Sequence, residues 1–208
     1  MHIIFDGDRV DLLRFLPKNG TCAEIGVLRG DFSAEILAVT NPKQLFLIDT
    51  WKQDESWLYC NLSKFPDASQ EKNYMYVCER FVNELTSGQM EIRRGWSVSE
   101  LPKLGMLDWG YIDANHDYEN VSADLNALVA RIKPDGFIMG HDWGQFGVKP
   151  AVEDFLKAHP EFYLTFVTNE KIESSFLLAR WAPSGRLRQE YLSGRSGGEI
   201  GRRASLRG

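Results

Sequence analysis

The chain lacks several features that would place it in a specialised class of protein. Its 208 residues include only three cysteines, Cys22, Cys60 and Cys78, whose odd number and spacing indicate neither a disulfide framework nor a thiolate metal site. Reduced, mostly structural thiols are therefore expected. The amino terminus has no basic segment followed by a long apolar run, which argues against a signal peptide and a membrane span. We expect a cytoplasmic protein with no membrane partner.

An excess of positive charge is also missing. The formal net charge is -5, whereas a general nucleic-acid surface needs a basic patch to contact phosphates. No nucleic-acid partner is therefore expected. The apolar share of 43% and the charged share of 25% are ordinary for a globular protein, and the length suits one well-buried domain.

The third glycine of a dinucleotide-binding turn is absent from the most informative stretch of the chain, residues 21–30. A short apolar run ends at Glu24 and passes Gly26 and Gly30 before a helix start at 31–35, in the spacing Glu-x-Gly-x-x-x-Gly. A dinucleotide site would have Gly-x-Gly-x-x-Gly, with glycine in place of Glu24. A carboxylate there would repel a pyrophosphate but suits a ligand with a sulfonium or ammonium charge. A purely structural turn is the alternative.

Along the rest of the chain, continuous apolar runs alternate with segments in which apolar residues recur at helical spacing. Buried strands are predicted at seven places, namely residues 21–25, 45–48, 90–93, 109–112, 137–139, 162–167 and 174–179. The first five alternate with helices, and the last two form a hairpin. The pattern predicts a Rossmann-like, doubly wound α/β fold with a mostly parallel seven-stranded sheet, an antiparallel C-terminal edge and helices on both faces.

The remaining segments define the expected domain organisation. Residues 1–182 form a single domain, which begins with a leading helix within residues 1–19 that Pro17 ends. Residues 51–69 have little periodicity and predict a long loop, which could close over a substrate or pack as a local aromatic cluster. Residues 183–208 are rich in Gly, Ser and Arg and predict a flexible tail, with a basic arm or a remnant of recombinant expression as alternatives.

Acids and histidines follow three of the predicted strands. Asp49 comes about twenty residues after the glycine turn, where doubly wound nucleotide folds place a carboxylate on ribose hydroxyls, although a turn aspartate is the alternative. Two further strands are followed by Asp113 with His116 and by His141 with Asp142. Ligands bind where the carboxyl ends of parallel strands meet, so these side chains are candidate site residues.

Four motifs together give a specific resemblance over roughly residues 20–180. They are Glu24-x-Gly26-x-x-x-Gly30, Leu47-Ile48-Asp49-Thr50-Trp51, Tyr111-Ile112-Asp113-Ala114-Asn115-His116-Asp117-Tyr118 and Gly140-His141-Asp142-Trp143. The chain resembles class I S-adenosylmethionine (SAM) dependent methyltransferases, in the group of macrocin-type sugar O-methyltransferases and cephalosporin-hydroxylase-like proteins. The resemblance implies that the residues of the first motif surround the methionine part of SAM.

The resemblance also assigns roles to individual residues. It implies that Asp49, with Thr50 beside it, binds the ribose and that Ser97 lies near the adenine. In metal-dependent relatives an aspartate after the fourth strand and a pair after the fifth bind a divalent ion, and the corresponding residues here are Asp113, His141 and Asp142. Asp113 is thus expected to take part in catalysis, in cofactor binding and in metal binding. His116 stands where such relatives carry the base that takes the acceptor's proton.

Methyl transfer itself explains why these residue types are needed. Because the sulfonium already activates the methyl group, the protein must align a nucleophile and remove its proton. A neutral imidazole such as that of His116 can accept the proton near physiological pH, and a metal can lower the pKa of a hydroxyl. The divalent ion would be Mg²⁺ or Mn²⁺, and because His141 is a softer ligand than Mg²⁺ prefers, Mn²⁺ or another transition ion is the better candidate. The alternative is a metal-free site in which His141 hydrogen-bonds Asp142 or the substrate.

We therefore expect a SAM-dependent O-methyltransferase acting on a small hydroxylated acceptor, such as a sugar or a natural product. The acceptor is expected to contact residues 51–69 and 145–149, the least periodic segments. An NAD-dependent oxidoreductase is one alternative, because Asp49 suits either cofactor. A protein of the same fold that binds SAM or a nucleotide without turnover, and a cephalosporin-hydroxylase-like protein, also remain open. The oligomeric state is not predicted, and a homo-oligomer is one of the options.

Overall fold

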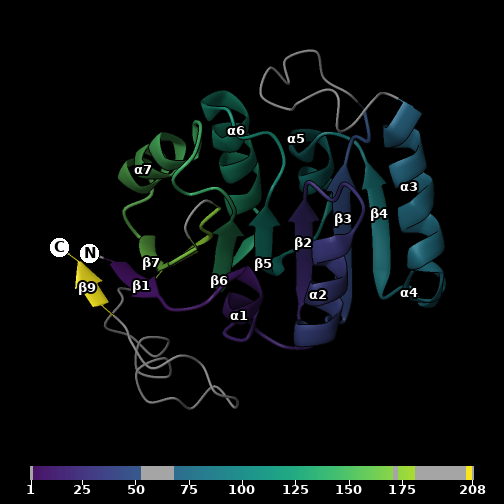
Figure 1. Cartoon of the computed structure of the whole chain (residues 1–208), viewed down its shortest axis with the longest axis horizontal. Helices are drawn as coiled ribbons and strands as arrows, with labels where there is room; N and C mark the ends of the chain where they lie inside the picture. Colours follow the sequence, from purple (N-terminus) through teal and green to yellow (C-terminus); the bar gives the residue numbers. More distant parts are fainter. Residues whose placement is uncertain (1, 53–67, 171–172, 181–204, 208) are drawn as a thin grey trace.

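One twisted sheet runs through the whole molecule (Figure 1). The computed structural model describes residues 2–52, 68–170, 173–180 and 205–207. Within these residues the strands are β1 (His2–Phe5), β2 (Thr21–Ile25), β3 (Gln44–Asp49), β4 (Met90–Arg94), β5 (Leu107–Ile112), β6 (Ile132–Gly140), β7 (Tyr163–Thr168), β8 (Phe176–Ala179) and β9 (Ser205–Arg207). Their order in the sheet is β4-β3-β2-β5-β6-β8-β7-β1-β9.

The strand order confirms the doubly wound fold predicted from the alternating apolar runs. Strands β2 to β6 pair in parallel, and the chain reverses direction across the sheet between β2 and β5. Strand β8 is antiparallel to both β6 and β7. All seven predicted strands are present as β2 to β8. The neighbouring carboxyl ends of β2, β5 and β6 lie at the topological switch point, where such sheets bind ligands.

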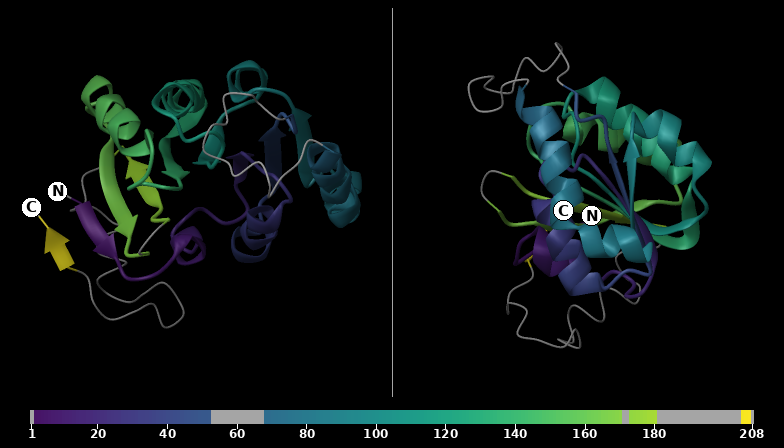
Figure 2. Two further views of the ribbon diagram at one scale, coloured as in Figure 1. Left: turned by 45° about the horizontal axis from the view of Figure 1, so that its top comes forward. Right: turned by 90° about the vertical axis from the view of Figure 1, so that its right-hand side faces the viewer.

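Helices cover both faces of the sheet (Figure 2), as the sequence predicts. They are α1 (Arg9–Leu13), α2 (Asp31–Thr40), α3 (Ala68–Arg80), α4 (Val82–Ser87), α5 (Ser97–Glu100), the 3-10 helix η1 (Leu101–Lys103), α6 (Tyr118–Val129) and α7 (Val148–Ala158). Buried side chains of α1, α2 and α3 pack on one face, and those of η1, α6 and α7 pack on the other. Consecutive strand residues alternate between these clusters: Leu45 and Leu47 belong to the first, and Phe46 and Ile48 to the second.

The amino terminus differs from the leading helix expected within residues 1–19. Residues His2–Phe5 form strand β1, which pairs in parallel with β7, and only Arg9–Leu13 form a helix. The side chains of Ile3 and Phe5 are buried in the sheet, and Asp8 then caps α1. The strand was missed because four residues are too few to show a clear alternation in the sequence.

Two expectations fall mainly outside the described residues. Residues 53–67 contain most of the expected loop, and residues 183–204 contain most of the expected tail. Residues Ser205–Arg207 form β9, which pairs antiparallel with β1. The roles of the loop and the tail therefore stay predictions. Within the described part of the chain, no helix has the length and apolarity required to cross a membrane.

Candidate functional site

The glycine turn joins β2 to α2 at the switch point of the sheet. Gly26 has φ +88° and Gly30 has φ +71°, in the left-handed region that glycine adopts without strain. A Cβ atom on Gly26 would lie 2.2 Å from the backbone oxygen of Asp113, at the end of β5. Any larger residue at position 26 would therefore displace the backbone of the neighbouring strand end.

Asp49 holds this turn from the end of β3. Its Oδ2 atom accepts hydrogen bonds from the backbone N–H groups of Val27 (2.8 Å) and Leu28 (3.0 Å), and its Oδ1 atom accepts one from Trp51 N–H (2.7 Å). The indole Nε1–H of Trp51 in turn donates to the carbonyl oxygen of Leu28 at 2.9 Å. Asp49 thus has the turn-aspartate contacts that were the alternative to a ribose role, while carboxylate oxygens retain lone pairs for a hydroxyl. Thr50, beside it, accepts a hydrogen bond from Lys52 N–H.

Glu24 lies inside the fold, beneath the turn. Its side chain is 1% exposed, and Ser33 Oγ donates a 2.5 Å hydrogen bond to Glu24 Oε2. Burial raises the pKa of Glu24 to about 8, the Ser33 hydrogen bond opposes this rise, and the charge of Asp113 adds to it. In the protein without ligand, Glu24 is therefore mostly neutral at pH 7. The sequence alone suggests a carboxylate at position 24, because burial depends on contacts that the sequence does not show.

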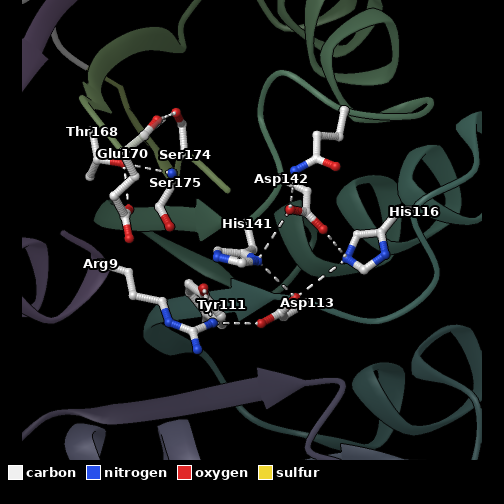
Figure 3. Close-up of polar contacts among 11 residues, drawn as sticks. Arg9, Tyr111, Asp113, His116, His141, Asp142, Thr168, Glu170, Ser174 and Ser175 are labelled. Atoms are coloured by element: carbon white, nitrogen blue, oxygen red, sulfur yellow. Dashed lines mark hydrogen bonds and ion pairs between the residues drawn. The ribbon is translucent and has the colours of Figure 1, made fainter. Parts of the chain in front are cut away.

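Asp113 is the central acid of the site. Its Oδ2 atom pairs with Arg9 Nη1 at 2.9 Å, while its Oδ1 atom lies 3.4 Å from His116 Nε2 and 3.4 Å from His141 Nδ1 (Figure 3). Burial alone would raise the pKa of Asp113. Hydrogen bonds from the two histidines and the charge of Arg9 outweigh burial and hold this pKa below its usual range. Asp113 is therefore an anion at physiological pH.

The two histidines share Asp142 as a second acidic neighbour. Asp142 Oδ2 lies 3.1 Å from His116 Nε2, and Asp142 Oδ1 lies 3.6 Å from His141 Nδ1. Burial lowers the pKa of His141, but the hydrogen bond and charge of Asp113 raise it overall. Burial raises the pKa of Asp142, and the charges of His116 and His141 only partly offset this. The structure thus brings together the four residues that the sequence singled out after β5 and β6.

Three of these side chains could hold a metal ion. One ligand atom each from Asp113, His141 and Asp142 lies within 4.8 Å of the other two. These are the three ligands that the resemblance implies. Two carboxylates with one imidazole suit a divalent transition ion such as Mn²⁺ better than Mg²⁺, which prefers oxygen ligands alone.

Ser97, expected near the adenine, is buried at the start of α5. Its hydroxyl donates a short hydrogen bond to Asp124 on α6. Burial raises the pKa of Asp124 to about 6, although this hydrogen bond opposes the rise. Sequence reasoning missed Asp124, because an acid in the middle of a helix is usually solvated. One feature of the sequence could have indicated its burial. Asp124 is next to Leu125 and three residues after Val121, and both of these lie on the buried face of α6.

Unusual backbone conformations gather around the same strand ends. Four residues other than glycine with positive φ lie there: Leu28 (52°), Trp51 (43°), Asp142 (55°) and Phe146 (50°). The ring of Phe146 is 5.8 Å from that of His116. Such conformations cost energy, persist only where surrounding contacts hold them, and cluster at functional sites.

Arg9 is the second residue that sequence reasoning missed. It belongs to the leading segment, in which no chemistry was recognised, yet its guanidinium pairs with Asp113, 104 residues further along the chain. Its place directly after the helix cap Asp8 predicts a helix start and nothing more. Only the fold reveals the contact.

Comparisons with known proteins identify a family and a shared fold. A family model described as a methyltransferase domain matches residues 23–143. Among solved structures, the O-methyltransferase NovP superposes with a TM-score of 0.59 at 18% identity, over 81% of this chain and 78% of NovP. TrmN from Thermus thermophilus gives 0.59 at 14% identity, over 83% of this chain but only 47% of TrmN, so the chain spans about half of that protein.

A third structure was solved with a bound ligand. SMU.1697c from Streptococcus mutans, in complex with SAH, superposes with a TM-score of 0.57 at 11% identity, over 82% of this chain and 94% of that protein. At these identities the likeness establishes a shared fold. No curated protein matches the chain by sequence.

Proposed function

Because the chain belongs to the class I SAM-dependent methyltransferases, as the family model matching residues 23–143 shows, we propose that it methylates a hydroxyl group of a small acceptor. One observation carries the proposal. His116 lies against Asp113 and Asp142 at the ends of neighbouring strands, and the backbone of Asp113 touches the glycine turn at Gly26. A base and the turn expected to bind the cofactor are thus adjacent.

The residues of the turn would bind and orient the cofactor. Its bound form supplies a methyl group already activated by the sulfonium. Gly26 allows the backbone at the end of β5 to approach the turn, and Asp49 and Trp51 hold the turn through three hydrogen bonds to Val27 and Leu28, with a fourth joining Trp51 to Asp49. Asp49 would accept hydrogen bonds from the ribose hydroxyls, with Thr50 beside it, and Ser97 would lie near the adenine.

His116 would act as the general base. Its Nε2 atom faces two acids, Asp113 and Asp142, so the neutral ring is stabilised with hydrogen on Nε2. The lone pair is then on Nδ1, which would take the proton from the acceptor hydroxyl. The imidazolium formed is stabilised by the same two carboxylates. The arrangement favours proton removal from a weakly acidic group such as a sugar hydroxyl.

A divalent ion fits beside the base. Asp113, His141 and Asp142 would hold it, and it would supply a lower pKa for a hydroxyl next to it. The salt bridge from Arg9 occupies the other oxygen of Asp113, so Oδ1 remains directed to the cluster. The mixed donor set favours Mn²⁺ over Mg²⁺.

The test is an assay of SAM conversion to S-adenosylhomocysteine (SAH) with a panel of methyl glycosides and small phenols, each with Mn²⁺, with Mg²⁺ and with EDTA. The expected result is acceptor-dependent SAH formation with equal amounts of methyl ether. Calorimetry with SAM and with NAD separately distinguishes the main alternative. Binding of NAD without binding of SAM would refute the proposed function. Binding of SAM without turnover of any acceptor would favour a non-catalytic protein.

A further inference from the structure

Arg9 enters the site from a part of the chain that precedes the matched family region. Its Nη1 atom donates to Asp113 Oδ2 at 2.9 Å and to the Tyr111 hydroxyl at 3.4 Å. Its Cζ atom lies 4.7 Å from the centre of the Phe32 ring, in the first turn of α2. The guanidinium therefore stands between the start of α2, which follows the glycine turn, and the end of β5, which lies against that turn.

The fold holds Arg9 in this place. Asp8 accepts hydrogen bonds from the backbone N–H groups of Val10 and Asp11, and this capping box fixes the start of α1. Leu12 and Leu13 on the same short helix are fully buried. Because the capping box and the buried leucines hold the backbone of α1, the Cα atom of Arg9 has a fixed position relative to the site. Little backbone conformational entropy would therefore be lost when the side chain binds a ligand.

The guanidinium has more donors than its protein partners use. Arginine carries five N–H groups, and both of the hydrogen bonds that Arg9 makes within the described residues use Nη1. Nε and Nη2 have no partner among those residues, although the side chain is only 31% exposed. Burial lowers the pKa of Arg9, but Tyr111 and Asp113 raise it overall, so the cation persists at any working pH. In Figure 3 the guanidinium directs one nitrogen to Asp113 and the others away from it.

A methionine moiety at this turn creates a requirement for such a cation. SAM carries an α-carboxylate, and Asp113 and Asp142 would repel it. Arg29, on the turn itself, is packed over the Tyr76 ring at 4.9 Å, and Arg80 pairs with Asp31. Among the arginines that the structure describes, Arg9 is the one that contacts the end of β5 and has N–H groups without a protein partner.

We propose that Arg9 binds the carboxylate of the methionine moiety of SAM through the N–H groups that Asp113 does not use. The inference rests on the proposed function, because it assumes SAM as the cofactor. It adds a specificity-determining residue: Arg9 distinguishes SAM from an analogue that lacks the carboxylate. Guanidinium–carboxylate hydrogen bonds of this kind correspond to roughly a 10- to 100-fold difference in affinity.

Calorimetry on the full chain with SAM and with decarboxylated SAM tests the proposal. We expect the wild type to bind SAM about 10- to 100-fold more tightly, and Arg9→Gln to lose most of this preference. Arg14→Gln is the matched control, because Arg14 caps the carboxyl end of the same helix, is exposed and contacts Asp11. It removes the same charge and should keep the wild-type preference. An unchanged preference in Arg9→Gln, or an equal loss of affinity for both compounds, would overturn the proposal.

A second variant covers the case in which Arg9→Gln does not fold, as judged by its thermal unfolding. Arg9→Lys keeps the charge but loses the planar fork, so it should show an intermediate preference for SAM over decarboxylated SAM. A preference equal to that of the wild type would count against Arg9 as the carboxylate ligand. If the wild type bound neither compound, the proposed function itself would fail. If it bound both equally well, only the role of Arg9 would fail.

Discussion

The Nε2 atom of His116 lies 3.1 Å from Oδ2 of Asp142 and 3.4 Å from Oδ1 of Asp113. The two residues that flank it come from the ends of β5 and β6, so the ring is held by two neighbouring strands. Two acids at Nε2 favour the neutral tautomer with hydrogen on that nitrogen, which would leave Nδ1 as the proton acceptor. The proposed role of His116 as the base for a hydroxyl acceptor depends on this contact.

Replacing His116 with Ala should lower turnover by roughly 10²- to 10⁴-fold, the usual contribution of a positioned general base. Binding of SAM should change little, because His116 contacts Asp113 and Asp142 rather than the glycine turn. Steady-state rates and calorimetry measure the two effects. His159→Ala is the control, since His159 stacks on Phe155 at the end of α7 and pairs with Glu161. Turnover that survives intact in His116→Ala would exclude this histidine as the base.

Removal of divalent ions should reduce turnover, and Mn²⁺ should restore it better than Mg²⁺ because His141 provides an imidazole ligand. His141→Asp replaces that ligand with an oxygen donor and should shift the preference towards Mg²⁺. Electron paramagnetic resonance of bound Mn²⁺ measures affinity independently of activity. Full activity after EDTA treatment, together with no detectable Mn²⁺ binding, would show that the site works without metal.

Glu24 should make the ligand-free protein less stable as pH rises. Its pKa is about 8 in the folded state, against an ordinary value of 4.5, so the unfolded chain releases this proton first. Its contribution to stability is complete below pH 4.5 and is lost as pH rises towards 8. Glu24→Gln should therefore be more stable than the wild type at pH 7 by on the order of 3 kcal/mol, with no difference near pH 4.

Urea unfolding at several pH values measures this difference. Glu35→Gln is the matched control, because Glu35 is exposed on α2 while Glu24 is buried beneath the same helix. A constant difference between Glu24→Gln and the wild type from pH 4 to pH 8 would mean that Glu24 ionises normally in the folded protein.

Gly26→Ala should destabilise the fold by about 2 kcal/mol or more and abolish SAM binding. The added Cβ would lie 2.2 Å from the Asp113 backbone oxygen, and the residue has φ +88°. Gly105→Ala is the comparison, because a Cβ there would meet no atom within 4 Å. Thermal unfolding and SAM calorimetry of both variants give the result. Equal behaviour of the two variants would mean that the close approach at Gly26 has no role.

The sequence predicted the elements whose signals are local. Leu45-Phe46-Leu47-Ile48 is apolar at every position because β3 is buried on both faces, and the acid at its end follows directly. Because each follows a predicted strand, Asp113, His116, His141 and Asp142 could also be predicted to lie together at the carboxyl ends of the parallel strands. Their mutual distances agree with that inference because neighbouring parallel strands end together.

What the sequence could not predict depends on contacts between distant segments. Arg9 and Asp113 are 104 positions apart in the sequence, and Ser97 and Asp124 are 27 positions apart. No regular spacing in the sequence indicates that either pair is in contact. The neutral state of Glu24 follows from its burial under α2, which a glycine motif does not reveal. Strand β1 was missed because its four residues gain their place by pairing with β7, formed some 160 residues later.

The decisive experiment is a crystal structure of the full chain with bound SAH. We expect the sulfur beside the glycine turn of residues 26–30 and facing His116, the ribose hydroxyls on Asp49, and the carboxylate on Arg9. SAH bound elsewhere on the molecule, or bound with its sulfur directed away from His116, would contradict this expectation.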